Sequence, residues 1–211
     1  MPTAQPTVVN RTITVSGNGK VTVKPDIATL NLGVQANAST ATAALSQSNA
    51  AATKLIAALK AAGVADDDIV TSGIQVYPTY SSGSFITGYQ SSNSVTVTVR
   101  SIDRTGPVID AAAAAAGDNV TIGGVSFSVG NPEKVLAAAR SAAIANAAAR
   151  AGQFADAAHV HVGSVLQISE VSVSPIPIFA SPTADAAGGA TPVQTGTQDL
   201  TVSVTVVYAL T

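Results

Sequence analysis

The residues that could hold a metal ion are few, and the first candidates are His159 and His161. Side chains alternate between the two faces of a strand, so histidines two residues apart face the same side. Imidazole is a common metal ligand, and Glu170 could add a carboxylate oxygen. Two histidines and a distant glutamate are a weak signal, because no motif fixes their geometry. We interpret both histidines as solvated or edge-strand side chains and predict that the chain holds no metal.

Three consecutive aspartates, Asp66-Asp67-Asp68, are the second candidate. Carboxylates are good calcium ligands, but a dedicated calcium loop spaces its ligands at alternating positions. This run lacks that spacing and lies between a predicted helix and a predicted strand. We therefore interpret it as a solvated connection between the two.

No residue pattern indicates an enzyme. A hydrolase of the elbow type needs Gly-x-Ser-x-Gly, which does not occur, and Ser82-Gly83-Ser84 lies in a predicted loop. A glycosidase needs two carboxylates at a set separation, and nothing sets the separation of Glu133 and Glu170. The chain has no cysteine, which excludes disulfides and thiol nucleophiles. We predict a non-enzymatic protein with no catalytic residues and no cofactor.

Aromatic side chains are the better candidates, because they suit binding surfaces. They make up only 4% of the chain, yet four of them fall around one predicted hairpin. Tyrosine buries a large area at a low entropic cost, which makes it a good contact residue. The alternative is that Tyr77 and Phe85 pack on the ends of helices. A second candidate for a contact surface is the apolar Ile-Pro-Ile-Phe segment at residues 176–179. The candidate interaction residues are Tyr77, Tyr80, Phe85, Tyr89, Ile176, Ile178 and Phe179.

The composition narrows the possible partners. Only 10% of the 211 residues are charged and the net charge is -2, so no basic face for nucleic acid is expected. A surface so poor in charge favours burial in an assembly, and we predict a homo-oligomer. The longest apolar run, Ala111 to Ala116, is far shorter than the ~20 residues of a membrane span. The first residues lack the features of a signal peptide, so an exported protein would be represented here by its mature part.

Hydrophobic periodicity predicts alternating strands and helices. Residues 69–77 follow a period of two and read as the central strand around which the fold is organised. Helices are expected over about 40–62, 104–116 and 132–158, the first ending at Gly63 and the last beginning at Asn131-Pro132. Gly17-Asn18-Gly19 predicts a tight turn between two short strands. Further strands are expected over about 26–34, 94–100, 120–129, 160–173 and 199–209.

This order predicts an α+β fold, with helices packed on one face of a largely antiparallel sheet. We expect a flexible leader over residues 1–11 and a single domain over residues 12–211. Residues 81–93 are expected to form a mobile hairpin tip, and residues 175–196 a Pro-rich excursion within the domain. A helix, a strand and Val-x-Pro occur in that order twice, which suggests an internal duplication of a strand-helix-strand unit.

Four segments together resemble the SIMPL-domain family. The first is I-x-V-x-G-x-G-x-V-x-V-x-P-D-x-A from Ile13 to Ala28, and the second is D-I-x-T from Asp68 with P-x-Y ending at Tyr80. The third is NVTIGGVSF at residues 119–127, which precedes an alanine-rich helix, and the fourth is GSVLQISE at residues 163–170. The resemblance extends from about Thr12 to Leu210. Each segment is moderately specific, and their order strengthens the match.

The resemblance implies an exported protein of a mostly bacterial family. Its members occur in the periplasm, in the outer envelope or as lipoproteins, and animal members are linked to signalling through a kinase-binding partner. The family looks like one of interaction and assembly domains, with oligomers and with no established catalytic residues. The present chain departs from a lipoprotein pattern because it has no cysteine to acylate.

We therefore expect a non-enzymatic cell-envelope protein that acts through self-assembly and binding of a protein partner. Alanine-faced helices and edge strands would join the subunits, and the aromatic hairpin would present a contact surface. The alternative is a small-ligand carrier with a pocket between sheet and helices.

Overall fold

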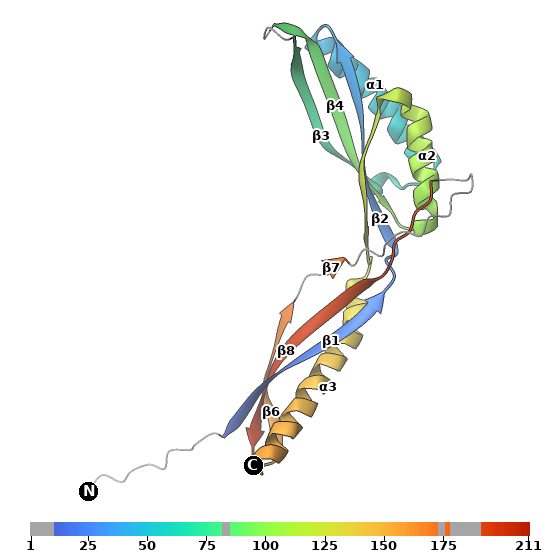
Figure 1. Cartoon of the computed structure of the whole chain (residues 1–211). Helices are drawn as coiled ribbons and strands as arrows, with labels where there is room; N and C mark the ends of the chain where they lie inside the picture. Colours follow the sequence, from blue (N-terminus) through green and yellow to red (C-terminus); the bar gives the residue numbers. More distant parts are fainter. Residues whose placement is uncertain (1–10, 82–84, 173–175, 178–190) are drawn as a thin grey trace. The chain divides into compact units, whose positions relative to one another are not determined.

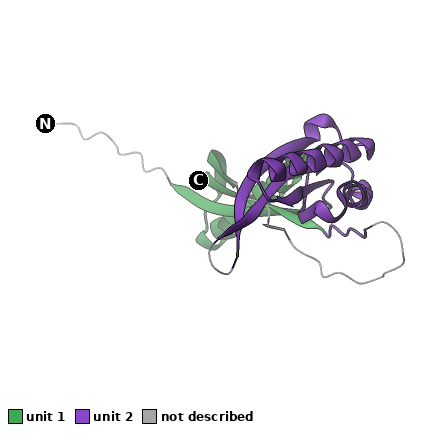
Figure 2. Cartoon of the chain, turned by 90° about the horizontal axis from the view of Figure 1, so that it is seen from above, with its two compact units in different colours: residues 1–24, 131–179, 197–211 green, residues 25–130, 180–196 purple. Residues whose placement is uncertain are grey.

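The structure is a computed structural model that describes residues 11–81, 85–172, 176–177 and 191–211. The chain divides into two compact units (Figure 2). Unit 1 consists of residues 1–24, 131–179 and 197–211, and unit 2 consists of residues 25–130 and 180–196. The chain thus leaves unit 1 after its first strand, forms most of unit 2, and returns.

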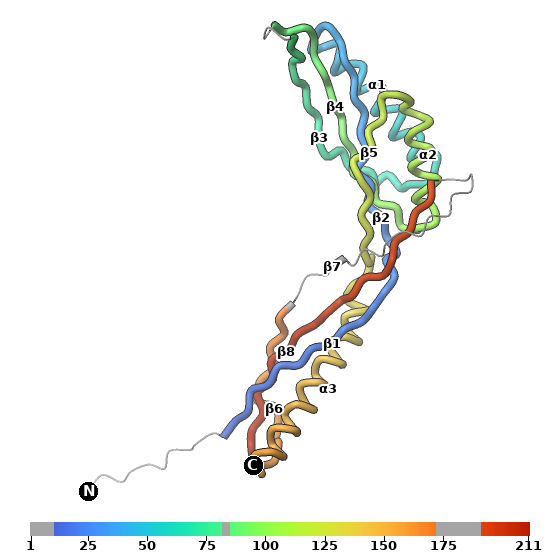
Figure 3. The backbone as a smooth tube through the Cα atoms, viewed as in Figure 1, coloured from blue at the N-terminus to red at the C-terminus, as the bar shows by residue number. Residues whose placement is uncertain are grey.

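Unit 1 is an antiparallel sheet with one long helix on one face (Figures 1 and 3). The strands β1 (Thr12–Val23), β8 (Gln198–Leu210) and β6 (Val162–Ser172) lie in the order β1-β8-β6, and the short β7 (Ile176–Pro177) also pairs with β8. The helix α3 (Pro132–Ala158) packs on β1 and β8. Its start follows the expected signals, since the Lys134 backbone N–H donates to the Asn131 side chain and Pro132 opens the first turn.

Glycines on β1 bring the helix unusually close to the sheet. A Cβ atom at Gly17 would overlap the backbone oxygen of Ala143, and one at Gly19 would overlap that of Ala139. The predicted turn at Gly17-Asn18-Gly19 is therefore wrong, because β1 runs without a break through these residues. The glycines are needed for close packing and not for a left-handed backbone. The alanines that face the sheet are spaced four apart: Ala139, Ala143, Ala147, Ala151 and Ala155.

Unit 2 is a four-stranded antiparallel sheet with two helices. The strands β3 (Ile69–Tyr80), β4 (Ile86–Val99), β2 (Ile27–Ala38) and β5 (Val120–Ser128) lie in the order β3-β4-β2-β5. The helix α1 (Ala41–Ala61) packs on β2 and β4, and α2 (Thr105–Ala116) packs beside α1. Short 3₁₀ turns, η1 (Asp66–Asp68), η2 (Ile102–Arg104) and η3 (Gly117–Asn119), connect these elements. The core consists of large aliphatic side chains, among them Leu30, Leu32, Leu55, Leu59, Val95, Val97 and Val108.

The two units repeat one arrangement of elements. In unit 2 the chain forms β2, α1, the edge strand β3 and then β4, which lies between β3 and β2. In unit 1 it forms β1, α3, the edge strand β6 and then β8, which lies between β6 and β1. This shared order agrees with the suggested repetition of a strand-helix-strand unit. Unit 2 then adds α2 and β5.

The predicted α+β class is confirmed, but three further details were wrong. The described strands form two sheets and not one. The strand of residues 69–80 lies at an edge, whereas β2 and β4 are central, so it is not the organising element. Residues 86–93 belong to β4 and are not a mobile tip. The polar residues there misled the prediction, since Ser91 is fully buried and its Oγ lies 2.7 Å from the Oγ of Ser48 on α1.

The predictions of a leader and of a Pro-rich excursion fall mostly outside the described residues, at residues 1–10, 173–175 and 178–190. Asp110 on α2 does accept hydrogen bonds from the backbone N–H and the hydroxyl of Thr191, at 3.2 and 2.6 Å. These contacts attach the end of the excursion to unit 2. The single domain over residues 12–211 stays a prediction.

Candidate functional site

The aromatic residues predicted for interaction lie on the β3–β4 hairpin of unit 2. Tyr77 is 54% exposed, Tyr80 is 60% exposed and Phe85 is 75% exposed, while Tyr89 is half-buried. The exposure of Tyr77 and Phe85 rules out the alternative that they pack on helix ends. Tyr77 pairs with Gln90, and strand alternation directs Tyr77 and Tyr80 to opposite faces of the hairpin. The four residues therefore share one hairpin without forming one patch.

The edge strands of unit 2 expose further apolar side chains that the sequence analysis did not select. Val70 and Ile74 on β3 are more than half exposed, and Ile122 on β5 is nearly so. β-branched side chains on both faces of a strand are typical of a buried strand, so the sequence did not predict that these residues are exposed. Among the described residues, no strand pairs with the outer edge of β3 or of β5. Each edge thus combines unpaired backbone groups with exposed apolar side chains.

Unit 1 has a similar edge at β6. Val165, Leu166, Ile168 and Val171 are each about half exposed. One cause is the position of α3, which packs mainly on β1 and β8 and contacts β6 little. Val171 pairs with Ser203 and lies on the face directed away from α3. Ile176 lies in β7, where its backbone pairs with Asp199, and the predicted contact residues Ile178 and Phe179 lie outside the described part of the chain.

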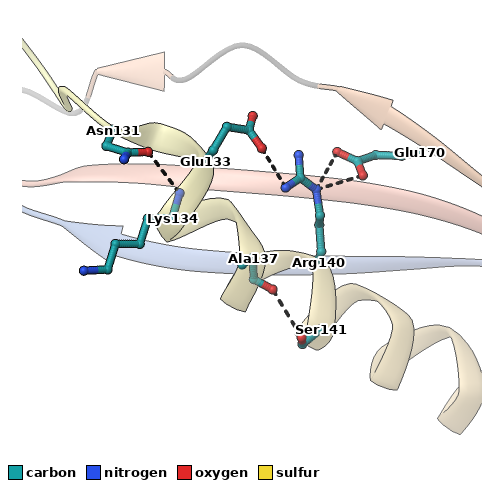
Figure 4. A network of polar contacts seen from close by, with 7 residues as sticks. All are labelled: Asn131, Glu133, Lys134, Ala137, Arg140, Ser141 and Glu170. Carbon is teal, nitrogen blue, oxygen red and sulfur yellow. Dashed lines mark hydrogen bonds and ion pairs between the residues drawn. The ribbon is translucent and has the colours of Figure 1, made fainter.

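A three-residue ionic network links α3 to β6 (Figure 4). The Arg140 Nε–H donates to both carboxylate oxygens of Glu170, at 3.2 and 3.0 Å, and its Nη1–H donates to Glu133 at 2.9 Å. Hydrogen bonds to the two carboxylates raise the pKa of Arg140 above its ordinary value. Because Glu170 is engaged here, it is not free to join His159 and His161. Both histidines are exposed, and His159 ends α3 with a left-handed backbone.

The aspartate run is only partly solvated, which corrects the prediction. Asp68 is buried, and both of its oxygens accept hydrogen bonds from Arg100, at 2.8 Å from Nε and 2.7 Å from Nη2. These hydrogen bonds lower the pKa of the Asp68 carboxyl. Asp66 is exposed and pairs with Lys60 at 2.9 Å. The described residues contain no group of three or more histidine, aspartate or glutamate side chains able to hold a metal.

Three hollows are present on the described surface. One of about 200 Å³ in unit 2 adjoins Asp68, Arg100 and Arg104. A second, of about 350 Å³ in unit 1, lies between β1 and the end of α3 and is lined mainly by apolar residues, among them Ile13 and Phe154. The third, of about 360 Å³, lies on the face of the unit 2 sheet and includes Tyr77. None of the helices described here is long and apolar enough to cross a membrane.

Comparison with known proteins identifies several relatives of the chain. It is 37% identical over 217 aligned positions to a 26 kDa periplasmic immunogenic protein of Brucella melitensis, covering 94% of this chain and 84% of that protein. It is 32% identical to the uncharacterized protein YggE of Escherichia coli over 74% of this chain and 64% of YggE. The SIMPL family, described as a protein of unknown function (DUF541), matches residues 13–208. The chain therefore belongs to the SIMPL family, as its sequence motifs predicted.

Proposed function

We propose that this protein is a non-enzymatic component of the cell envelope that acts through self-assembly and protein–protein interaction. The observation that carries the proposal is the exposure of apolar side chains along the edge strands β3, β5 and β6. An exposed edge offers backbone donors and acceptors to a strand of another chain, and apolar side chains add buried area. Proteins that remain monomeric usually protect such edges with charged residues, which these strands largely lack.

The alanines of α3 that face the sheet are not available for contacts between subunits. They are already buried against β1 and β8 inside unit 1. The proposed contacts are therefore the edge strands and the aromatic β3–β4 hairpin. A location in the periplasm is supported by the Brucella relative, which is named as a periplasmic protein.

Light scattering at several concentrations tests self-assembly. We expect an oligomer whose mass falls when a lysine interrupts an edge, in Ile168→Lys on β6 or Ile74→Lys on β3. Both side chains are exposed, so each unit should still fold. Ile144→Lys is the matched control, because Ile144 is also exposed but lies on α3. A monomer at all concentrations, or an oligomer weakened only by Ile144→Lys, would contradict the proposal.

A second function, a carrier of small apolar ligands, is favoured by the hollow at the end of α3. Its volume of about 350 Å³ lies within the range typical of ligand sites. The dye ANS, whose aromatic rings bind apolar surfaces, should bind there and lose affinity in Ala158→Leu, which enlarges a side chain of the lining. Unchanged dye binding in that variant would exclude this hollow.

A further inference from the structure

The outer face of the unit 2 sheet, opposite α1, carries an unusual set of side chains. Strand register assigns alternate residues of β2 and β4 to this face, and most of the residues between them face α1 and form the core. Where β2 and β4 pair, all of the outward residues are uncharged and polar, apart from one glycine. They are Thr29, Asn31, Gly33, Gln35 and Asn37 on β2, and Gln90, Ser92, Ser94, Thr96 and Thr98 on β4.

Three rows of residues cross the central strands, and most of their members line the hollow of about 360 Å³. In the middle row, Ser92 on β4 lies between Gln35 on β2 and Gln75 on β3. On one side of it, Ser94 lies between Gly33 and Gly73, which have no side chains to fill the space. Of the residues in these two rows, Gly33, Gln35, Gln75, Ser92 and Ser94 line the hollow. In the row on the other side, Gln90 lies between Asn37 and Tyr77.

The polar groups of the hollow have few partners within the protein. Gln90 donates to Asn37 at 3.3 Å. Within the described residues, no hydrogen bond engages the side chains of Gln35, Gln75, Ser92 or Ser94. Each glutamine amide offers two donors and an acceptor, and each hydroxyl can donate and accept. The hollow thus presents both kinds of hydrogen-bonding group beside the exposed ring of Tyr77.

These properties select one class of ligand. A charged ligand would find no opposite charge in the lining, and an apolar ligand would leave amides and hydroxyls without partners. A sugar has hydroxyls that both donate and accept, and its C–H groups can lie on the negative face of an aromatic ring. We propose that the open sheet face of unit 2 binds an uncharged oligosaccharide, with the amides and serines contacting hydroxyls and Tyr77 stacking on a sugar ring.

Chemical-shift mapping by NMR tests the proposal on the full chain. Chitotriose, cellotriose and maltotriose serve as probes, because they are uncharged and differ in linkage and substituents. At least one should cause saturable shifts at residues of the three rows. Tyr77→Ala should weaken the affinity by about tenfold, and Gln75→Leu should weaken it while preserving side-chain size. Tyr80→Ala is the matched control, since Tyr80 is an equally exposed tyrosine of the same strand outside the hollow.

Several outcomes would overturn the proposal. They are no shifts with any of the three sugars up to millimolar concentration, equal affinity in Tyr77→Ala and Tyr80→Ala, or shifts outside the rows. Preferential binding of a Ser/Gln-rich peptide would assign the face to a protein partner instead. The amide spectrum of each variant confirms that it is folded. Light scattering on the same samples reports self-assembly separately, so the failure of one proposal can be told from the failure of the other.

Discussion

In both units a helix packs on a sheet, but the side chains at this contact differ in size. Each places a helix on a sheet through the order strand, helix, edge strand, central strand. Unit 1 packs alanines of α3 directly on the backbone of β1 at Gly17 and Gly19. Unit 2 packs leucines of α1, such as Leu55, on the valines and leucines of β2 and β4.

This difference decides how each unit responds to change. Unit 1 depends on the absence of side chains, because the distance between helix and sheet is set by backbone contact. Unit 2 depends on the volume of its side chains, because large aliphatic groups fill a wider space. Adding atoms between the helix and the sheet should therefore destabilise unit 1, and removing atoms from the core should destabilise unit 2.

The largest effect is expected for Gly17→Val in unit 1. The new side chain would overlap the backbone of α3, and since a backbone cannot rotate away as a side chain can, α3 must move. We expect a loss of roughly 4 kcal/mol or more in the free energy of unfolding, measured by urea titration. Gly73→Ala is the control, because its Cβ would meet nothing within 4 Å.

The same variant tests the predicted single domain. If residues 12–211 form one cooperative domain, the amide signals of both units should disappear together during urea unfolding of Gly17→Val. If unit 2 signals persist after those of unit 1 are lost, the prediction of a single domain is wrong.

The second largest effect is expected for Leu55→Ala in unit 2. Leu55 is fully buried in the core between α1 and the sheet. Truncation removes buried apolar area and leaves a cavity, which should lower the free energy of unfolding by about 3 kcal/mol. Ile56→Ala, at a half-buried neighbouring position, should cost less. Equal losses in the two variants would mean that the core around Leu55 collapses to fill the space.

Features set by neighbouring residues could be predicted from the sequence, whereas contacts between distant segments could not. Helix ends were predictable because local signals such as Asn131-Pro132 and Gly63 specify them within a few residues. The role of Gly17 and Gly19 was not, because it depends on α3, more than a hundred residues away. The sequence alone does not distinguish a glycine that forms a turn from one that permits close packing.

The site residues were less predictable than the fold. The exposure of Tyr77 and Phe85 agrees with a contact role, but that of Ile168 depends on where α3 lies over the sheet. The hollow on unit 2 combines Gln35, Ser92 and Gln75 from three strands. Only the strand register brings them into one row, and a single strand does not reveal its register.

A smaller effect is expected for Asp68→Asn, which removes the ion pair with Arg100. The folded pKa of Asp68 lies below the unfolded value, so its contribution is present above the unfolded pKa and is lost as the pH falls through the folded pKa. Because Arg100 is largely exposed, we expect a loss of only about 1 kcal/mol at neutral pH. Urea titrations at neutral pH and at a pH below the folded pKa of Asp68 should show that the variant loses less stability on acidification than the native chain.

Asp66→Asn is the matched control for this prediction. Asp66 also pairs with a cation and lies in the same turn, but it is exposed. Its replacement should leave the unfolding free energy nearly unchanged, since exposed ion pairs contribute little. A loss as large as that of Asp68→Asn would show that the charge of the turn matters, and not the buried hydrogen bonds.

The smallest effect, of opposite sign, is expected for Gly152→Ala on α3. Gly152 lies inside the helix, and an added Cβ would meet nothing within 4 Å. Alanine favours the helix over glycine and restricts the unfolded chain, so we expect a gain of about 0.7 kcal/mol in the free energy of unfolding. Urea titration should then show opposite signs for two glycines of the same unit, Gly17 and Gly152. If Gly152→Ala also destabilised unit 1, the sensitivity would belong to α3 as a whole, and contact at β1 would no longer explain the difference between the units.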